Sequence, residues 1–544
     1  MQLDYHPQTK AFTLMVPRGA SPSPQEIMRD YGFDFSLPRS TPAEGCLYTF
    51  EPYAAASFGA SASRAAQEQL QPILTQIDAS WADSYSGTRL DMPADQELSP
   101  YQSAGVRYAL DRTNAIIGDE PGLGKTMQAA VVANELRAKR VAVVCPAAIR
   151  RQWVKKLLEW TTLPYPTFHV VDHGRKGWNP TANFTVVSYD LLRSPGVGTA
   201  LASGYYDLII GDELQYAKTI DSARTRAIFG GGRSLSHAPL VSRCDRFLGL
   251  TGTPTPNRAR ELYTPIRGLC HDAIDWMSQE RFTERFNPSK RITGTRADGS
   301  TYTYIDERSG RLAELGNRLR ANLMVRRLKR QVLPQLQLPV YDLVYAEATG
   351  AVKAALQAER LLDIDPDTLA GANADVLGQI ATVRRQMGIA LAPHGCAYVE
   401  TLLRSGVEKV GIFAWHIEVL DIIQKTLDRW GVVRVDGSSS PASRARSIER
   451  FRNDPKCRII EGNHLSLGTG TDGLQDVCSN AVLFEPDWTS GNNQQCFDRF
   501  DRIGQRRVVQ GDILVARGSL SEKVLARALS KLGNIHKTLD RRVA

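Results

Sequence analysis

The stretch that carries the clearest chemistry is residues 116–126, which read IIGDEPGLGKT. An apolar run leads into a glycine-rich turn, and Lys125 and Thr126 then open a helical pattern. Gly122 and Gly124 allow backbone N–H groups to turn toward phosphate oxygens, and a helix N-terminus favours negative charge. We expect Lys125 to reach the β- and γ-phosphates and Thr126 to hold Mg²⁺. The stretch therefore predicts a nucleotide phosphate site.

A carboxylate pair follows another apolar run about 85 residues further on, where Leu208–Gly211 lead into Asp212 and Glu213. On its own, an Asp-Glu pair is more often a surface turn. After an apolar strand and a phosphate loop, it is the second half of a hydrolytic site. Asp212 is expected to hold the Mg²⁺ shell, and Glu213 to orient or deprotonate the attacking water. Together the two stretches indicate hydrolysis of a nucleoside triphosphate.

Short apolar runs that alternate with helical stretches must position these groups, and nearly continuous runs of this kind are typical of parallel sheets covered on both faces. The first series of runs is 115–117, 141–144, 185–187, 208–210 and 247–250. The second series is 410–413, 432–435, 458–460, 481–484 and 512–515. We therefore expect an α/β protein with two lobes. Residues 1–93 form a separate small α+β unit in this prediction, with strands near 11–16 and 46–50 and a helix near 64–77.

Composition places the 544 residues among globular proteins, because 42% are hydrophobic and 23% charged. This excludes a disordered chain, a fibre and a small disulfide scaffold. The eight cysteines include no C-x-x-C pair. No apolar run approaches the roughly 18 residues that span a bilayer, and the opening residues lack the apolar core of a signal peptide. We expect no membrane partner, a monomer, and a cytoplasmic location in a prokaryotic or viral host cell, or a nuclear one in a eukaryote.

The positive charge is concentrated in one stretch. The chain has 67 Lys and Arg against 58 Asp and Glu, a net +9, and residues 281–330 hold 13 basic and 5 acidic residues, a net +8. A solvated helical face is one interpretation. The other is contact with phosphates of a nucleic acid, which would make binding salt-dependent.

Further motifs occur in a fixed order along the chain. In the first half they are LSPYQSAGVRYAL with Gln102, DEPGLGKT, VAVVCPAAIRRQW, SYDLL at 188–192, LTGTPTPN at 250–257 and VRRLKRQVLPQL at 325–336. In the second half they are VDGS at 435–438 with Arg444, SLGTGTDGLQ at 466–475 and QCFDRFDRIGQ at 495–505. In this set and order, over roughly 95–535, the chain resembles superfamily 2 helicases. Among these it resembles the Swi/Snf-type DNA translocases, and in form the annealing-helicase or fork-remodelling branch.

The resemblance implies two RecA-like P-loop lobes with a basic helical insert and the small N-terminal domain. The expected divisions are 1–93 (accessory domain), 94–265 (ATP-binding lobe), 266–339 (basic helical insert and end of that lobe), 340–395 (helical connection) and 396–544 (second lobe). ATP and Mg²⁺ are the implied cofactors.

Site residues follow from the matched motifs. Arg502 is the implied arginine finger with Arg499 beside it, and the second lobe would bring Arg502 to the nucleotide opposite Lys125 and Glu213. The implied nucleotide-binding residues are Gln102, Gly122, Leu123, Gly124, Lys125, Thr126, Met127, Gln215, Gly470, Asp472 and Gln505. The implied DNA-binding residues are Pro146, Arg151, Ser188, Tyr189, Thr253, Arg326, Arg327, Lys329, Gly437, Ser438, Arg444, Ser466 and Thr469. Trp153 and Trp488 are either base-stacking platforms or buried structural residues, the second being favoured.

One position departs from the family pattern, since D-E-x-H is usual and Gln215 stands here in the place of the His. A Gln side chain both donates and accepts hydrogen bonds, so it is able to link the nucleotide site to neighbouring motifs. We expect ATPase activity to be retained.

The leading hypothesis is an ATP-dependent translocase that moves along duplex or forked DNA and remodels it or displaces bound protein. DNA-bound proteins or a polymerase are the further expected partners. One alternative is a strand-separating DNA or RNA helicase. Another is a non-motor nucleic-acid-binding or polymerase-associated module.

Overall fold

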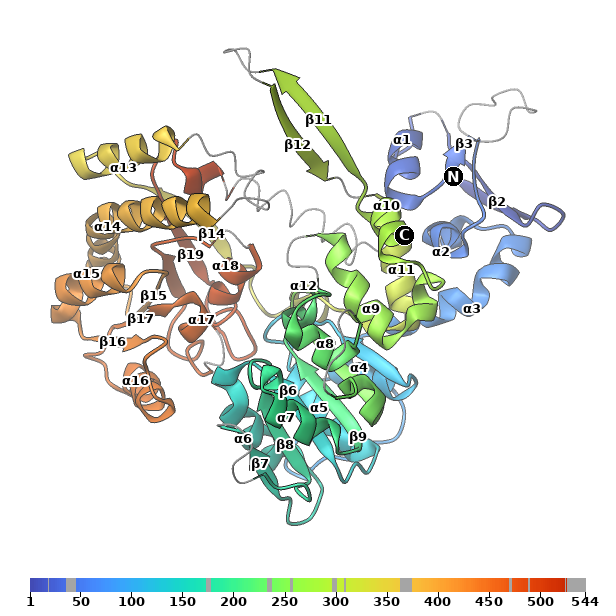
Figure 1. Ribbon diagram of the computed structural model, residues 1–544, viewed down its shortest axis with the longest axis horizontal. Helices are drawn as coiled ribbons and strands as arrows, with labels where there is room; N and C mark the ends of the chain where they lie inside the picture. The colour runs from blue at the N-terminus through green and yellow to red at the C-terminus, as the bar shows by residue number, and fades with distance from the viewer. Residues whose placement is uncertain are drawn as a thin grey trace. The chain divides into compact units, whose positions relative to one another are not determined.

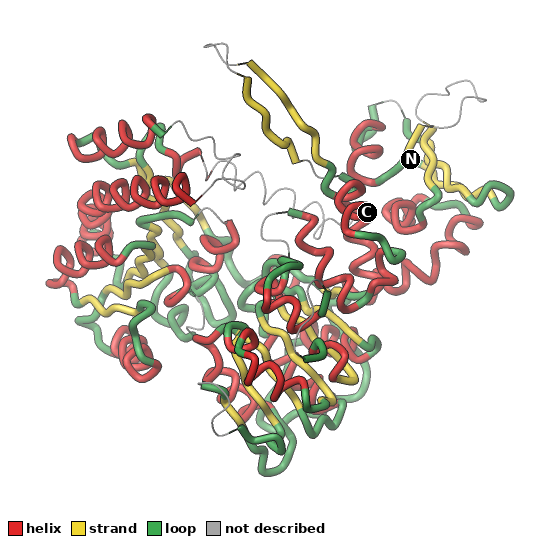
Figure 2. Tube along the Cα trace, in the orientation of Figure 1, coloured by secondary structure: helices red, strands yellow, loops and turns green. Residues whose placement is uncertain are grey.

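The structure is a computed structural model that describes the chain except for residues 18, 36–45, 173–177, 232–236, 255–257, 296–300, 308–309, 363–373, 469–471, 488–489, 524 and 526–544. The chain divides into two compact units, one made largely of residues 1–332 and the other largely of residues 333–532. Each unit has its own parallel sheet between helices (Figures 1 and 2).

The main sheet of the first unit has seven parallel strands in the order β13-β5-β10-β9-β6-β8-β7. The strands are β5 (Asn114–Ile117), β6 (Val141–Cys145), β7 (Phe168–Val170), β8 (Phe184–Ser188), β9 (Tyr206–Asp212), β10 (Cys244–Leu250) and β13 (Met324–Val325). Two apolar clusters cover its faces. One includes residues of α4 (Pro100–Leu110), α5 (Lys125–Glu135) and α6 (Arg150–Trp160). The other includes residues of α7 (Pro195–Ala202), α8 (Ala223–Phe229) and α9 (Tyr263–Leu269).

The N-terminal part of this unit is an antiparallel sheet in the order β1-β2-β4-β3. Its strands are β1 (Gln2–His6), β2 (Ala11–Met15), β3 (Asp34–Phe35) and β4 (Cys46–Thr49), and they pack with α2 (Pro52–Ala55) and α3 (Arg64–Trp81). Ala321 of α11 (Leu312–Asn322) belongs to the same apolar cluster. Leu315 and Leu319 of α11 lie in an apolar cluster of the seven-stranded sheet, so the two sheets of this unit share a helix.

The basic stretch is not purely helical. It holds α10 (Gln279–Phe286), α11 and α12 (Lys329–Val332), but between α10 and α11 the chain forms the antiparallel hairpin of β11 (Ser289–Thr295) and β12 (Thr301–Glu307). In the described part of the chain these two strands pair only with each other (Figure 1). The reason lies in the composition, because Thr, Tyr and Ile follow one another at 301–305, and such residues favour strands.

The sheet of the second unit has six parallel strands in the order β14-β19-β18-β15-β17-β16. The strands are β14 (Val340–Tyr345), β15 (Val410–Ala414), β16 (Val432–Val435), β17 (Ile459–Asn463), β18 (Asn480–Leu483) and β19 (Gln510–Val515). The helices are α13 (Gly350–Leu361), α14 (Ala374–Arg404), α15 (Ile417–Leu427), α16 (Pro441–Asn453), α17 (His464–Leu467) and α18 (Ser490–Phe497). Strand β14 lies within the stretch 340–395 that we expected to be a helical connection, and it pairs with β19.

The α/β prediction with two parallel sheets and a small N-terminal sheet is confirmed. No helix among the described residues is both long and apolar enough to span a membrane.

Candidate nucleotide site

The phosphate loop connects β5 to α5. Gly122 and Gly124 have φ values of 86° and 77°, the left-handed region that favours glycine. At Gly124, a Cβ atom would lie 2.3 Å from Nε2 of Gln102, so the Gln102 amide lies directly against the loop. Lys125 donates from Nζ to the carbonyl oxygens of Asp119 and Glu120, at 2.8 and 3.2 Å. The loop, its lysine and Gln102 are thus assembled at one place.

The other loop residues follow from the same turn. Leu123 is buried, whereas Thr126 and Met127 in the first turn of α5 are partly exposed. Met127 packs against the Gly124 position, with its Cε 2.4 Å from where a Cβ would lie. Thr126 therefore keeps access to solvent at the N-terminus of α5, where an anion is favoured.

The carboxylate pair lies at the carboxyl end of β9. Asp212 is buried, and its Oδ2 accepts a 2.8 Å hydrogen bond from Nε1 of Trp153. Burial and the neighbouring Glu213 carboxylate raise the pKa of Asp212 to about 7. Glu213 has a φ of 53°, which non-glycine residues rarely adopt and which turns the chain sharply after the strand. Two adjacent carboxylates, one of them buried, form a negative site suited to a cation.

Mg²⁺ fits the residues present. Asp212 offers an anionic oxygen ligand and Thr126 a hydroxyl, and the mutual repulsion of Asp212 and Glu213 is what a cation relieves. Among the described residues no three His, Cys, Asp or Glu side chains converge as a metal site. Mg²⁺ in proteins often takes one or two protein ligands and completes its shell with water and substrate phosphates.

Gln215 connects the carboxylate pair to the next strand. Its Nε2 donates to Glu213 Oε2 over 2.6 Å, and its Oε1 accepts from the Thr251 hydroxyl over 2.8 Å. The Thr251 hydroxyl oxygen accepts from the backbone N–H of Thr253 over 3.1 Å. The structure thus shows a link from the Glu213 carboxylate to the LTGTPTPN segment, as the chemistry of Gln suggested, and the link passes through Thr251.

Several expected DNA-binding residues of the first unit lie beneath this site. Ser188 and Tyr189 are buried, and the Tyr189 hydroxyl donates to the backbone carbonyl of Asp212 over 2.8 Å. Pro146 is buried as well. Arg151 is exposed and pairs with Asp172 at 3.3 Å. Of this group, the Arg151 side chain is the one that solvent reaches freely.

The basic residues after β13 differ most from expectation. Arg326 and Arg327 are only 4% and 1% exposed, and Lys329 is buried too. Arg326 donates to the carbonyls of Gly118 and Gly252 at 2.7 and 3.2 Å, and Arg327 forms an ion pair with Asp119 at 3.0 Å. We expected these three residues to contact DNA. Their placement does not match that role, because their hydrogen bonds hold the start of the phosphate loop inside the protein.

The second unit carries the remaining predicted residues. Gly437 and Ser438 form an exposed turn after β16, where the Ser438 N–H and hydroxyl donate to Asp436 at 2.9 and 2.6 Å. Arg444 is partly buried on α16, and burial lowers its pKa. Ser466 is buried on α17. The expected residues Thr469 and Gly470 lie outside the described residues, as does Trp488.

In the RIGQ segment of the same unit, the side chains of Arg502 and Gln505 form hydrogen bonds with nearby parts of the chain. Arg502 donates from Nε to the Asp498 carbonyl at 3.0 Å and pairs with Asp472 at 3.4 Å. Arg499, three residues earlier, is partly buried. Gln505 donates to the carbonyls of Cys478 and Phe500 at 2.9 and 3.1 Å. The structure thus joins Asp472, Arg502 and Gln505 within one unit.

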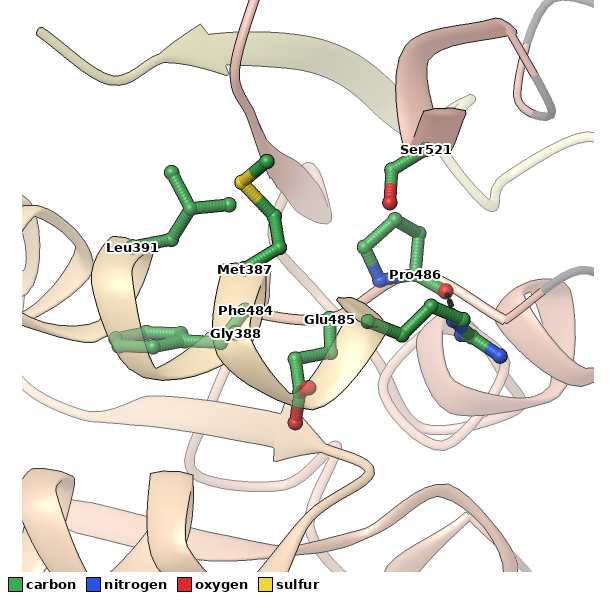
Figure 3. A pocket seen from close by; sticks show the side chains of 8 residues that line it. Met387, Gly388, Leu391, Phe484, Glu485, Pro486 and Ser521 are labelled. Carbon is green, nitrogen blue, oxygen red and sulfur yellow. Dashed lines mark hydrogen bonds between the residues drawn. The ribbon is translucent and has the colours of Figure 1, made fainter. Parts of the chain in front are cut away.

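A small pocket of the second unit is separate from these motifs. It lies between α14 and the segment after β18, and Figure 3 shows its lining, with Met387 and Leu391 on the helix. Arg384 donates to the Pro486 carbonyl at 2.9 Å, and the Glu485 carboxylate accepts from the backbone N–H groups of Trp415 and His416. These polar groups are satisfied by the protein itself.

Sequence reasoning did not find the function of Trp153 or the position of Thr251. The structure makes Trp153 a buried donor to Asp212, which agrees with the favoured structural interpretation. Thr251 directly follows β10, which neighbours β9 in the sheet, so the two strand ends lie side by side. Because neighbouring parallel strands end side by side, the position of Thr251 directly after a strand was a sequence signal that could have placed it near Asp212. No pattern in the sequence pairs Trp153 with Asp212.

Comparisons with known proteins agree with the motifs. Residues 101–345 match the family described as the SNF2-related domain. The DNA annealing helicase and endonuclease ZRANB3 of Bos taurus is 28% identical over 466 residues, which cover 82% of this chain and 41% of that protein. The SWI/SNF-related matrix-associated actin-dependent regulator of chromatin subfamily A-like protein 1 of Bos taurus is 31% identical over 446 residues, covering 80% and 44%. The chain spans less than half the length of these relatives.

Among solved structures, the Sulfolobus solfataricus SWI2/SNF2 ATPase core in complex with dsDNA matches with 19% sequence identity and a TM-score of 0.38. The match covers 83% of this chain and 99% of the archaeal one.

Proposed function

We propose that the chain, whose residues 101–345 match the SNF2-related domain, hydrolyses ATP to translocate along duplex or forked DNA. The movement remodels the DNA or displaces bound protein. Two relatives support the DNA substrate, since one is named a DNA annealing helicase and the other a regulator of chromatin.

The observation that carries the proposal is the chain of hydrogen bonds from Glu213 to the segment after β10, beside a phosphate loop with its lysine. Lys125 donates to the carbonyl oxygens of Asp119 and Glu120, and an anionic phosphate oxygen is a stronger partner for an ammonium group than a neutral carbonyl oxygen. Glu213 is held by Gln215, which is held by Thr251. A change at the hydrolytic carboxylate therefore reaches the LTGTPTPN segment through two hydrogen bonds.

Each residue then has a defined task. Lys125 neutralises phosphate charge, Gln102 contacts the nucleotide beside Gly124, and Glu213 orients the attacking water. Bound Mg²⁺, held by Asp212 and Thr126, supplies further neutralisation of phosphate charge. Arg499 and Arg502 stabilise the charge that develops during transfer, as the RIGQ motif predicts.

Measurement of ATP turnover tests the proposal, with duplex, forked and single-stranded DNA and RNA as stimulators. Duplex or forked DNA should stimulate turnover, and Lys125→Ala should abolish it. Lys155→Ala, at an exposed lysine on α6, is the matched control and should behave as wild type. Equal turnover in the wild type and the Lys125→Ala variant would contradict the proposal.

Two further assays separate the alternatives. Displacement of a third strand from a DNA triplex reports translocation, and release of a labelled strand from a fork reports strand separation. Strand release without triplex displacement would favour the helicase alternative. DNA binding without any turnover would favour the non-motor module.

A further inference from the structure

Arg327 lies where three parts of the first unit meet. Its side chain is 1% exposed. The guanidinium donates from Nε and Nη2 to the two carboxylate oxygens of Asp119, each at 3.0 Å, and the backbone N–H of Arg327 donates to the same carboxylate at 3.0 Å. Nη1 donates to the carbonyl oxygen of Tyr101 and to that of Ala82, the latter at 3.4 Å.

Each of these partners belongs to a different element. Asp119 is the second residue after β5 in the phosphate-loop segment, and it is fully buried. Tyr101 precedes Gln102 in the first turn of α4, and Gln102 lies against Gly124 of the loop. Ala82 directly follows α3 of the N-terminal part. The guanidinium of Arg327 is therefore hydrogen-bonded to the loop, to the helix that bears Gln102 and to the residue after α3.

The Arg327 guanidinium packs closely against α4. A Cβ atom at Gly105, in the interior of α4, would lie 2.4 Å from Nη2 of Arg327 and 2.1 Å from Oε1 of Gln128. A glycine inside a helix costs roughly 0.5–1 kcal/mol relative to alanine, so its presence here has a packing reason. The Gln128 amide also donates to Asp119, at 3.1 Å.

The backbone fixes the same junction. Strand β13 pairs with β5, with Met324 opposite Ile116 and Val325 opposite Ile117. The Glu120 N–H then donates to the Arg327 carbonyl at 3.0 Å. The first half of the phosphate loop is thus held along its length by residues 324–327, through the sheet and then through the side chain of Arg327.

The end of α3 is attached to this segment as well. Ser80 donates from its hydroxyl to the Met324 carbonyl at 2.9 Å and accepts from Arg320 at 3.0 Å. The Arg320 guanidinium lies 3.3 Å from the centre of the Trp81 ring. The N-terminal part is therefore joined to the strand that supports the phosphate loop.

We propose that Arg327 is a positioning residue of the nucleotide site, which sets the phosphate loop and the Gln102 helix in one geometry so that Lys125 and Gln102 engage the same nucleotide. It touches no substrate atom itself. The inference rests on the proposed function for its biological meaning. The quantities that it predicts are the affinity for nucleotide and, through the amide of Gln102, the preference for one base over another. Small displacements of binding groups have large effects, because about 1 Å of misplacement can cost roughly a hundredfold in rate.

The test compares Arg327→Lys with Arg318→Lys. Arg318 is also 1% exposed, but its ion pairs are with Glu314, Glu51 and Asp275, which lie outside the phosphate loop. Both variants keep the charge and lose the planar fork that binds two oxygens. The thermal midpoint Tm of each variant reports the loss of stability. Nucleotide binding is measured as the dissociation constants of a fluorescent ATP analogue and of its GTP counterpart. The KM and kcat for ATP measure the activity of the site.

We expect both variants to lower Tm, but Arg327→Lys alone should weaken binding of the ATP analogue about tenfold or more, raise KM and reduce the preference for ATP over GTP. Gly105→Ala, which displaces the same guanidinium, should shift these values in the same direction. Binding and selectivity within twofold of wild type in Arg327→Lys would overturn the inference, as would an equal loss in Arg318→Lys. A wild type that binds the analogue without hydrolysing ATP would refute the proposed function, while the affinity comparison would still decide the role of Arg327.

Discussion

Trp153 donates its indole N–H to the carboxylate of Asp212 over 2.8 Å, and both side chains are buried. The two residues come from α6 and the end of β9, 59 positions apart in the chain. The hydrogen bond favours the ionised carboxylate and lowers its pKa, which burial and Glu213 otherwise raise to about 7. Trp153 thus helps to keep Asp212 charged near neutral pH.

Replacing Trp153 by Phe should therefore shift the pH dependence of ATP turnover. Without the donor, the pKa of Asp212 rises further and the acidic limb of the rate profile moves to higher pH. A hydrogen bond of about 1 kcal/mol corresponds to roughly 0.7 of a pH unit. Trp160→Phe is the matched control, because Trp160 is buried on the same helix and does not bond Asp212. Identical rate profiles for the wild type and Trp153→Phe would show that this bond does not control ionisation.

Asp212 should also make folding stability depend on pH. Its pKa is raised in the folded state from 3.8 to about 7, so the folded protein binds more protons than the unfolded chain between these values. Stability should therefore fall as pH rises through this window. Asp212→Asn should remove that loss, by an amount on the order of a few kcal/mol. Urea unfolding of both proteins at pH 5 and pH 8 measures it, and a parallel pH dependence in the two proteins would argue against the raised pKa.

Much of the fold was legible in the sequence because buried parallel strands leave continuous apolar runs, as Val141–Cys145 and Leu208–Ile210 do. Three described strands of the two parallel sheets lack such an apolar run. Strand β13 has two residues and β7 three, and most side chains of β14 are exposed at the edge of the sheet. Their pairing depends on neighbouring strands that are distant in the sequence.

In the candidate site, too, features set by local sequence were predictable, and features set by distant strands were not. The positions of the phosphate loop after β5 and of the carboxylate pair at the end of β9 were predictable, because each directly follows a local apolar run. The burial of Arg326 and Arg327 was not, since charge can be counted in a sequence but ion pairing with Asp119 depends on the sheet. The two residues directly follow β13, and the sheet carries them into the interior.

Gln215 should couple DNA binding to hydrolysis. Gln215→Ala breaks the link between Glu213 and Thr251, so stimulation of turnover by DNA should fall about tenfold, within the range usual for coupling between sites. Turnover without DNA should change little, because Lys125 and Glu213 remain. Thr251→Val removes the other end of the link and should give the same result. A Gln215→Ala variant that DNA stimulates normally would place the coupling elsewhere.

Arg502 should act on the chemical step. Arg502→Ala is expected to lower kcat by about 10³-fold or more, as the loss of an arginine finger does, with a much smaller change in ATP affinity. Arg507→Ala is a suitable control, because Arg507 is an exposed arginine of the same region that pairs with Glu408 at 3.2 Å. Turnover and nucleotide binding are measured separately for each variant. A weakened affinity with unchanged kcat would contradict the assigned role.

DNA binding should depend on salt less steeply than the charge of residues 281–330 suggests. Five of the 13 basic residues in this stretch, Arg318, Arg320, Arg326, Arg327 and Lys329, are buried and therefore release no counterions from DNA. Arg281 and Arg330 are exposed, so each substitution by Ala should weaken duplex binding and reduce the slope of log Kd against log salt by about one. Arg107→Ala, at an exposed arginine outside the stretch, should leave the slope unchanged. Titrations between about 50 and 200 mM salt measure this slope. Slopes equal to that of the wild type in both variants would exclude residues 281–330 as the surface that binds DNA.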